Sequence, residues 1–345
     1  MVARVAQVRR VAVLRGGGLG DLVLSLPALE ALRAAYPDAE VVLLAGPAHA
    51  ALLAGRPSPV DRVVVVPQVD GLHGFGPPGD LDGWLAARRA EAPDVALQLH
   101  GGGGASNPLV SALGARVTVG ARDAGAPPLD RTVPWSSHVH EVLRSLEVVG
   151  LVGAAPVTTV PRLGSVPGDR VAPPPGDGPL VVLHPGASDA RRRWPHFAAL
   201  AGALRDQGCR VAVVGAGEPS CRAVAAESGA VDLVDALALP QLLGLLAAAD
   251  LVVGNDSGPR HLAAALGTPT VGVYRAAVLT VAGPSSAVGT RVAVGHRTAC
   301  PVCGREQEGA PRCPHEVSFL DDVPVARVLA LAEELLGERA QTGRA

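Results

Sequence analysis

Short apolar runs alternate with helix-length amphipathic stretches along most of this chain. This alternation predicts repeated strand–helix units built around parallel sheets. The first series of strands is expected at Val11–Leu14, Val41–Leu44, Val63–Val66, Val95–Leu99 and Arg116–Val119. Helices are expected between them, notably at Leu22–Tyr36, and a helix around His138–Val149 closes the series.

A second series begins after a stretch that is crowded with Pro and Gly, residues 152–179. Its strands are expected at Leu180–Leu183, Arg210–Val214, Val231–Leu233, Leu251–Val253, Thr270–Val273 and Arg291–Val294. Its helices are expected at Trp194–Gln207, Arg222–Ser228, Leu239–Ala249, Arg260–Leu266 and about Asp322–Glu338. The Pro-rich stretch has no sustained helical period and marks a domain boundary.

The two series predict two α/β domains, residues 1–160 and 161–345, each a Rossmann-like doubly wound parallel sheet. Ligands of such sheets bind at the carboxyl ends of the strands, so the site is expected in a cleft that the two domains face. A length of 345 residues agrees with two domains.

Composition narrows the class of protein. Apolar residues make up 48% of the chain and charged residues 18%, which is typical of a compact globular protein. A net charge of −2 argues against a nucleic-acid partner. The chain has no Lys, so any cationic contact with phosphate must come from Arg, a planar fork of donors.

No apolar stretch predicts a signal peptide or an integral membrane segment. We therefore expect a cytoplasmic protein, with peripheral membrane contact if it acts on a lipid.

Three motifs carry candidate chemistry, and the first is Arg15-Gly16-Gly17-Gly18-Leu19-Gly20-Asp21 between a strand and a helix. Glycines let a ligand approach the backbone and leave amide groups at a helix N-terminus, where an anion is favoured. Equally, Asp21 could cap the helix and the glycines could form a tight turn. The motif is a poor dinucleotide fingerprint, because Ala45-Gly46-Pro47 follows the next strand where an acidic residue is expected.

The second motif, His184-Pro185-Gly186-Ala187-Ser188, also follows a strand and leads into Arg191-Arg192-Arg193-Trp194. Small residues, a hydroxyl and arginine forks suit a diphosphate, although a solvated basic loop is the alternative. The third motif, Gly254-Asn255-Asp256-Ser257-Gly258-Pro259-Arg260-His261, lies at a strand–helix junction. Its polar groups could bind a ligand, or Asp256 and Ser257 could cap the helix while His261 packs.

Residues 13–32, 183–197 and 248–273, which contain these motifs, resemble the three signature blocks of glycosyltransferase family 9 in order and spacing. The best-known members of this family are ADP-heptose:lipopolysaccharide heptosyltransferases, and the resemblance covers nearly the whole chain. It implies the GT-B architecture, an N-terminal acceptor-binding domain and a C-terminal donor-binding domain.

The resemblance also implies roles for individual residues. Asp21 corresponds to the general base, and Arg192 stands where the family has a Lys that contacts the donor's phosphates. Glu218 matches the acidic residue associated with the nucleoside. The remaining donor-binding candidates are Gly18, Gly20, His184, Gly186, Ser188, Asp256, Ser257, Gly258 and His261. Enzymes of this type generally need no divalent metal or other cofactor for catalysis.

The function implied is inverting transfer of a heptose, or a related sugar, from a nucleotide diphosphate sugar to an acceptor hydroxyl. ADP-heptose is the first choice of donor, and the acceptor is a glycan, a glycolipid or a natural product. Two alternatives remain open: a nucleotide-sugar epimerase of GT-B architecture, and a catalytically inactive nucleotide-sugar-binding protein.

Four residues near the C-terminus offer metal-ligand chemistry: Cys300, Cys303, Cys313 and His315. Three thiols and an imidazole in one short loop could hold a structural zinc ion. Reduced thiols or a disulfide are the alternatives.

Overall fold

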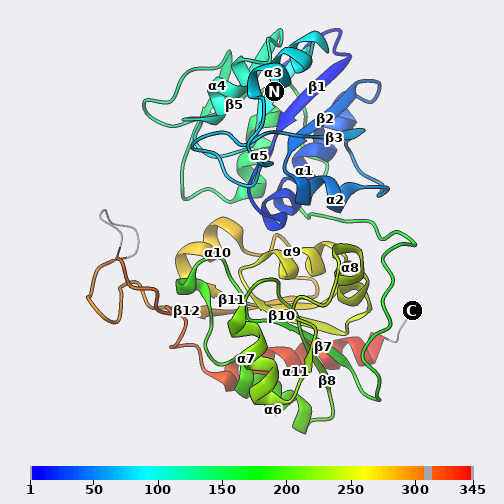
Figure 1. Ribbon diagram of the computed structural model, residues 1–345, viewed down its shortest axis with the longest axis vertical. Helices are drawn as coiled ribbons and strands as arrows, with labels where there is room; N and C mark the ends of the chain where they lie inside the picture. Colours follow the sequence, from blue (N-terminus) through cyan, green and yellow to red (C-terminus); the bar gives the residue numbers. More distant parts are fainter. Residues whose placement is uncertain (1, 307–312, 343–345) are drawn as a thin grey trace. The chain divides into compact units, whose positions relative to one another are not determined.

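The computed structural model describes residues 2–306 and 313–342, which form two compact units divided after Gly164. Each unit contains one six-stranded sheet (Figure 1). All strand pairs in both sheets are parallel. The predicted fold class, α/β with two doubly wound parallel sheets, is confirmed.

The first unit has the strand order β3-β2-β1-β4-β5-β6. Its strands are β1 (Arg10–Leu14), β2 (Glu40–Ala45), β3 (Arg62–Val65), β4 (Val95–Gln98), β5 (Val117–Arg122) and β6 (Arg131–Pro134). Its helices are α1 (Leu19–Ala35), α2 (Pro47–Leu53), α3 (Leu81–Ala90), α4 (Ser106–Ser111) and α5 (Glu141–Gly150). The chain reverses its direction of travel across the sheet beside β1, the position where ligands bind in doubly wound folds.

The second unit has the order β12-β11-β10-β7-β8-β9. Its strands are β7 (Leu180–His184), β8 (Arg210–Val213), β9 (Val231–Asp232), β10 (Leu251–Asn255), β11 (Thr270–Arg275) and β12 (Thr290–Gly295). Its helices are η1 (Ala190–Arg192, one 3₁₀ turn), α6 (Phe197–Asp206), α7 (Pro219–Ser228), α8 (Leu239–Ala248), α9 (Gly258–Ala265), α10 (Ala276–Ala282) and α11 (Val325–Thr342). Counted from its own first strand, this unit repeats the strand order of the first.

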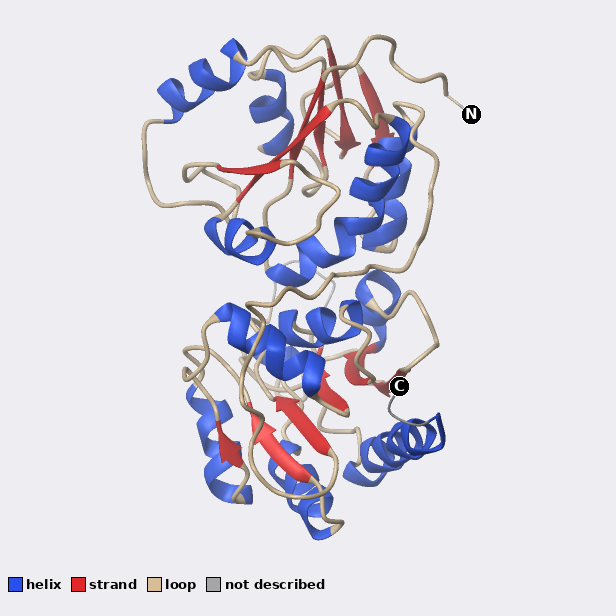
Figure 2. Ribbon diagram, turned by 90° about the vertical axis from the view of Figure 1, so that its right-hand side faces the viewer, coloured by secondary structure: helices blue, strands red, loops and turns tan. Residues whose placement is uncertain are grey.

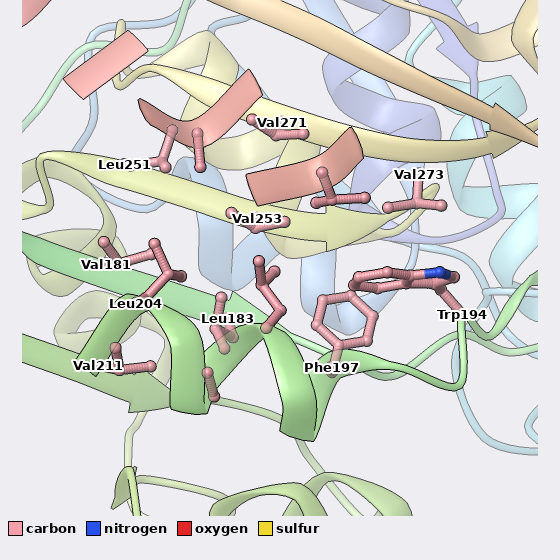
Figure 3. Close-up of a cluster of buried hydrophobic side chains, with 14 of the residues drawn as sticks. Val181, Leu183, Trp194, Phe197, Leu204, Val211, Leu251, Val253, Val271 and Val273 are labelled. Carbon is pink, nitrogen blue, oxygen red and sulfur yellow. The ribbon is translucent and has the colours of Figure 1, made fainter. Parts of the chain in front are cut away.

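Apolar side chains between each sheet and its helices make the cores, and Figure 2 shows helices on both sides of the strands. In the second unit, Val181, Leu183 and Val253 are fully buried in one cluster with Trp194 and Phe197 (Figure 3). Fully burying one such side chain contributes roughly 1.5–3 kcal/mol. The buried strands have continuous apolar sequences because parallel strands that are covered by helices on both faces expose neither side.

Several element bounds differ from the prediction. Helix α1 begins at Leu19, three residues before the expected start, so Gly20 and Asp21 lie in its first turn. Helix α6 begins at Phe197, three residues after the expected start, and residues 190–192 before it form η1. Strand β6 and helix α10 were not predicted. Among the described residues, no helix is both long enough and apolar enough to cross a bilayer.

Candidate functional site

The glycine-rich turn of the first unit joins β1 to α1 and is packed against the loop that follows β3. Gly17 donates its amide to the carbonyl of His73, with a distance of 3.0 Å. A Cβ atom on Gly16 would lie 2.7 Å from that same carbonyl, and one on Gly74 would lie 2.2 Å from the carbonyl oxygen of Gly17. Close backbone packing therefore requires these glycines, whereas Gly18 is exposed and open.

Asp21 lies in the first turn of α1 with its carboxylate 45% exposed. Its Oδ2 atom accepts the amide of Gly18 at 2.7 Å, and its Oδ1 atom lies 3.2 Å from Nη2 of Arg15. The expected capping contact is thus present, but it uses one oxygen and leaves the carboxylate accessible. A positioned, accessible carboxylate can act as a general base.

Arg15 is the buried cation of this turn, with 4% of its side chain exposed. Its guanidinium also bonds the carbonyl of Leu99 and lies 3.5 Å from the carboxylate of Glu141. Two carboxylates and two carbonyls, those of Leu99 and Asp21, therefore fix its position. A buried charge held in this way keeps Asp21 in place at little entropic cost.

Two buried histidines surround the turn. His49 lies 3.1 Å from the carbonyl of Gly18, and burial lowers the pKa of its imidazole. His100 follows β4 and contacts His73 edge to face, with ring centroids 5.1 Å apart. Burial, with the charge of Arg15, lowers the pKa of His100 to about 4. Both imidazoles are consequently neutral at pH 7 and offer hydrogen-bonding groups without charge.

In the second unit, the turn after β7 is built around buried polar contacts. His184 Nδ1 lies 2.9 Å from the hydroxyl of Ser257, and burial lowers the pKa of His184 to about 4. The carboxylate of Glu218 accepts the amide of Ala187 at 3.2 Å. A Cβ atom on Gly186 would lie 2.4 Å from both carboxylate oxygens of Glu218, so glycine is what lets this carboxylate lie over the turn.

Arg192 joins the second and third motifs. Its Nη1 atom donates to Asp256 Oδ2 at 2.8 Å, and its Nη2 atom donates to the hydroxyl of Ser188 at 2.5 Å. The buried amide of Asn255 also links these motifs, because it accepts the amide of Trp194 and donates to the carbonyl of Pro185. The two loops therefore form one hydrogen-bonded assembly.

Asp256 is the buried centre of this assembly, with 8% of its side chain exposed. Burial alone would raise its pKa, but His261 and the guanidinium groups of Arg192 and Arg260 outweigh it and lower the pKa to about 2. His261 Nε2 lies 3.0 Å from Asp256 Oδ1, while Nη2 of Arg260 lies 2.7 Å from His261 Nδ1. The imidazole of His261 therefore lies between the carboxylate of Asp256 and the guanidinium of Arg260.

The side chains of Asp256 and Ser257 do not cap helix α9, which was the alternative role considered for them. Ser257 is the N-cap residue of α9, yet its side chain makes no capping hydrogen bond and contacts His184 instead. Asp256 uses its carboxylate on Arg192 and His261. Gly258 is the first residue of α9, whose N-terminus therefore adjoins this polar network.

Cys300, Cys303, Cys313 and His315 also come together, in the loop between β12 and α11. Their ligand atoms all lie within 4.8 Å of one another. All three cysteines are free thiols, as are Cys209 and Cys221. These four residues could hold a metal ion of the kind that prefers sulfur and nitrogen ligands.

The predicted site residues thus form three groups. Gly18, Gly20 and Asp21 lie at one turn of the first unit, and the four metal-ligand candidates lie in one loop of the second. The remaining candidates lie in or beside the polar network at the turns after β7 and β10: His184, Gly186, Ser188, Arg192, Glu218, Asp256, Ser257, Gly258 and His261. The prediction missed Arg15 as a partner of Asp21, Glu141 as a partner of Arg15, and Asn255 as a link between the two loops of the second unit. Arg15 and Asn255 lay within the motifs, but Glu141 is distant in sequence and gave no signal.

A family model described as glycosyltransferase family 9 (heptosyltransferase) matches residues 90–309. A stretch of 119 residues is 37% identical to lipopolysaccharide heptosyltransferase 2 of Escherichia coli K12. That stretch covers 31% of this chain and 32% of the relative, so the chain aligns with about a third of the length of this curated protein.

Solved structures extend the comparison over the whole fold. A family 9 glycosyl transferase from Veillonella parvula has a TM-score of 0.75 at 19% identity, covering 96% of this chain and 98% of that one. The E. coli ADP-heptose lps heptosyltransferase II has a TM-score of 0.72 at 21% identity, covering 95% and 99%. The two sheets are therefore those of a heptosyltransferase-type fold. Because the family model spans more than half of the sequence, this chain belongs to glycosyltransferase family 9.

Proposed function

We propose that this protein transfers a heptose, or a related sugar, from a nucleotide diphosphate sugar to an acceptor hydroxyl, with ADP-heptose as the first choice of donor. The observation that carries the proposal is the hydrogen-bonded assembly of Ser188, Arg192, Asp256 and His261 at the carboxyl ends of β7 and β10. Family membership and the heptosyltransferase name of the E. coli relative support the choice of sugar.

The second unit is proposed to bind the donor. Arg192 uses one N–H of each terminal nitrogen on Asp256 and Ser188, so its planar fork retains further donors for phosphate oxygens. A Lys would have to divide three donors among the same partners. Glu218, which lies over the turn after β7, would accept hydrogen bonds from the nucleoside's hydroxyl groups.

The first unit is proposed to bind the acceptor and to supply the base. Asp21 would take the proton of the acceptor hydroxyl as that oxygen bonds to the anomeric carbon of the donor. The bond from the anomeric carbon to the phosphate oxygen breaks at the same time, and its electron pair leaves with the nucleotide diphosphate. Arg192 would stabilise the charge that develops there. Attack from the face opposite the leaving group inverts the anomeric configuration.

Transfer by these groups needs no divalent metal, because Arg192 and the N-terminus of α9 supply the positive potential at the leaving group. A zinc ion at Cys300, Cys303, Cys313 and His315 would be structural, since none of these residues belongs to the donor assembly. The acceptor would be a glycan, a glycolipid or a natural product that carries a free hydroxyl.

Thermal stabilisation by nucleotide diphosphates and nucleotide sugars tests the donor assignment. A ligand at about 100 times its dissociation constant adds roughly 2.7 kcal/mol to stability. We expect ADP and ADP-sugars to raise the melting temperature, and Arg192→Ala to abolish that rise. Selectivity for UDP or GDP compounds would rule out ADP-heptose, and no response to any of them would overturn the donor site.

Product analysis with ADP-heptose separates transfer from the alternatives. We expect ADP release that depends on an added acceptor and on Asp21. Epimer formation without an acceptor would instead identify an epimerase. Donor binding with no turnover over an acceptor panel, unchanged by Asp21→Asn, would identify an inactive binding protein.

A further inference from the structure

Three of the distances between the four ligand candidates are close to the edges of a tetrahedral metal site. Cys303 Sγ lies 3.4 Å from Cys313 Sγ, and His315 Nδ1 lies 3.2 Å from Cys313 Sγ and 3.7 Å from Cys300 Sγ. A zinc tetrahedron with sulfur at about 2.3 Å and nitrogen at about 2.1 Å has edges of about 3.5–3.8 Å. A disulfide would instead need sulfur atoms about 2.05 Å apart, and the three thiols are free.

The backbone around the thiols is shaped to support thiolate ligands. Val302 donates its amide to Cys300 Sγ at 3.4 Å, and His315 donates its amide to Cys313 Sγ at the same distance. The amide of Gly304 bonds the carbonyl of Cys300 at 2.8 Å, and a φ of +70° at Gly304 closes this tight turn. Such amide contacts orient the sulfur atoms and stabilise their negative charge.

The loop is joined to the proposed phosphate-binding segment by a short chain of contacts. The buried ring of Phe319 packs in one cluster with Cys300 and Cys313. The amide of Phe319 donates to the carbonyl of Arg191 at 3.1 Å, and the hydroxyl of Ser318 donates to the carbonyl of Arg193 at 2.6 Å. These two contacts hold the backbone on either side of Arg192. Figure 1 shows the loop in orange where it leaves the second unit's sheet.

We infer that Cys300, Cys303, Cys313 and His315 bind one Zn²⁺ or Fe²⁺ ion, and that this ion fixes the segment carrying Arg192 through Ser318 and Phe319. Both ions suit a site of three thiolates and one imidazole. The second half of the inference rests on the proposed function, because it makes donor affinity depend on a metal outside the donor assembly. The ion acts by ordering residues 190–194, and it takes no part in the transfer step.

Metal content tests the first half. Protein produced with zinc and iron in the medium should contain one ion per chain by elemental analysis, and Cys303→Ser should lose it. Cys303 is exposed, so its substitution leaves the buried cluster packed. Cys209→Ser, which changes a half-buried thiol outside the cluster, should retain the ion. A wild-type protein without a stoichiometric metal would overturn the site.

Hydrogen exchange and ADP titration test the second half separately. Loss of the ion in Cys303→Ser should speed amide exchange in residues 190–197 and weaken ADP binding about fivefold or more. Ser318→Ala should weaken ADP binding while keeping the ion, and Cys209→Ser should change neither measurement. Unchanged exchange in Cys303→Ser would overturn the coupling. Because exchange is measured without ADP, this result stands even if wild-type protein binds no ADP and the proposed function fails.

Discussion

Asp21 combines an anchored position with an accessible carboxylate, and this combination makes its substitution informative. Asp21→Asn keeps an oxygen for the amide of Gly18 but loses the ability to accept a proton. We expect transfer to fall about 10²–10⁴-fold while ADP affinity and melting temperature stay close to those of the wild type. Steady-state kinetics with ADP titration measures this, and a fall in melting temperature of many degrees would mean a structural role instead.

Arg15 offers a second test at the same turn, because it acts on Asp21 without facing solvent. Glu141→Gln removes one of the two carboxylates beside its guanidinium, leaving Asp21 as the remaining anionic partner. One of the groups that fix Arg15 is then lost, so we expect the guanidinium to hold Asp21 less firmly and kcat to fall, while KM for the acceptor stays close to that of the wild type. Steady-state kinetics measures both constants. An unchanged kcat, with only the melting temperature reduced, would contradict a positioning role.

Because the guanidinium of Arg192 is a planar fork of donors, we expect Arg and Lys at position 192 to differ in their affinity for ADP. Arg192→Lys keeps the charge but cannot bond Asp256 and Ser188 in one planar arrangement. We expect ADP affinity to fall about tenfold, since lost charge-assisted hydrogen bonds cost about 1.5–3 kcal/mol each and Lys recovers part of this. Isothermal titration measures the change. Arg191→Lys is the control, because Arg191 pairs with Asp189 instead, and equal losses in both variants would contradict the assignment.

The lowered pKa of His184 makes the free energy of unfolding depend on pH. Burial lowers its folded pKa to about 4 from an ordinary value of 6.5, so the unfolded chain binds a proton in this window that the folded chain does not. Stability is therefore lost as pH falls from 6.5 towards 4, by on the order of 3 kcal/mol for this group. Urea unfolding at pH 7 and pH 4.5 should show a smaller loss in His184→Gln. His49 and His100, whose pKa values are also lowered, should leave a residual slope.

At the scale of elements, two glycines with positive φ test how much close backbone packing contributes to stability. Gly74 has a φ of +78°, and a Cβ there would lie 2.4 Å from the backbone nitrogen of Gly17. Gly74→Ala should therefore destabilise the first unit by about 1–3 kcal/mol beyond the backbone cost, because the added Cβ has no room. Gly55 is the matched control, because its φ is +65° and a Cβ there would have no atom within 4 Å. Chemical unfolding of both variants measures the difference, and equal losses would show that the contact is dispensable.

The sequence predicted elements better than contacts. Buried parallel strands such as Leu180–His184 appear as apolar runs, and each of the other strands except β6 overlaps a run from which it was predicted. Strand β6, Arg131–Pro134, was not predicted because it is short and polar at one end. The chemistry of the motifs was also readable from local residue types. Contacts between residues far apart in the sequence could not be predicted. Arg15 and Glu141, for example, are 126 positions apart.

The two units each have their own sheet and their own buried core, so a ligand of one need not stabilise the other. If the second unit alone binds the donor, ADP should protect amides of β7, β10 and α9 from exchange while those of β1 and β4 stay unchanged. Hydrogen exchange followed by mass spectrometry checks this across the whole chain. Equal protection in both units would contradict the assignment of the donor to the second.

The repeated strand order makes the turn after β1 and the turn after β7 topological counterparts. One carries Asp21, and the other carries the glycine and serine beside Arg192. The same framework therefore presents two different sets of side chains at equivalent turns. Because each turn belongs to its own sheet and core, residues at one turn can be exchanged by grafting without altering the framework that holds the other.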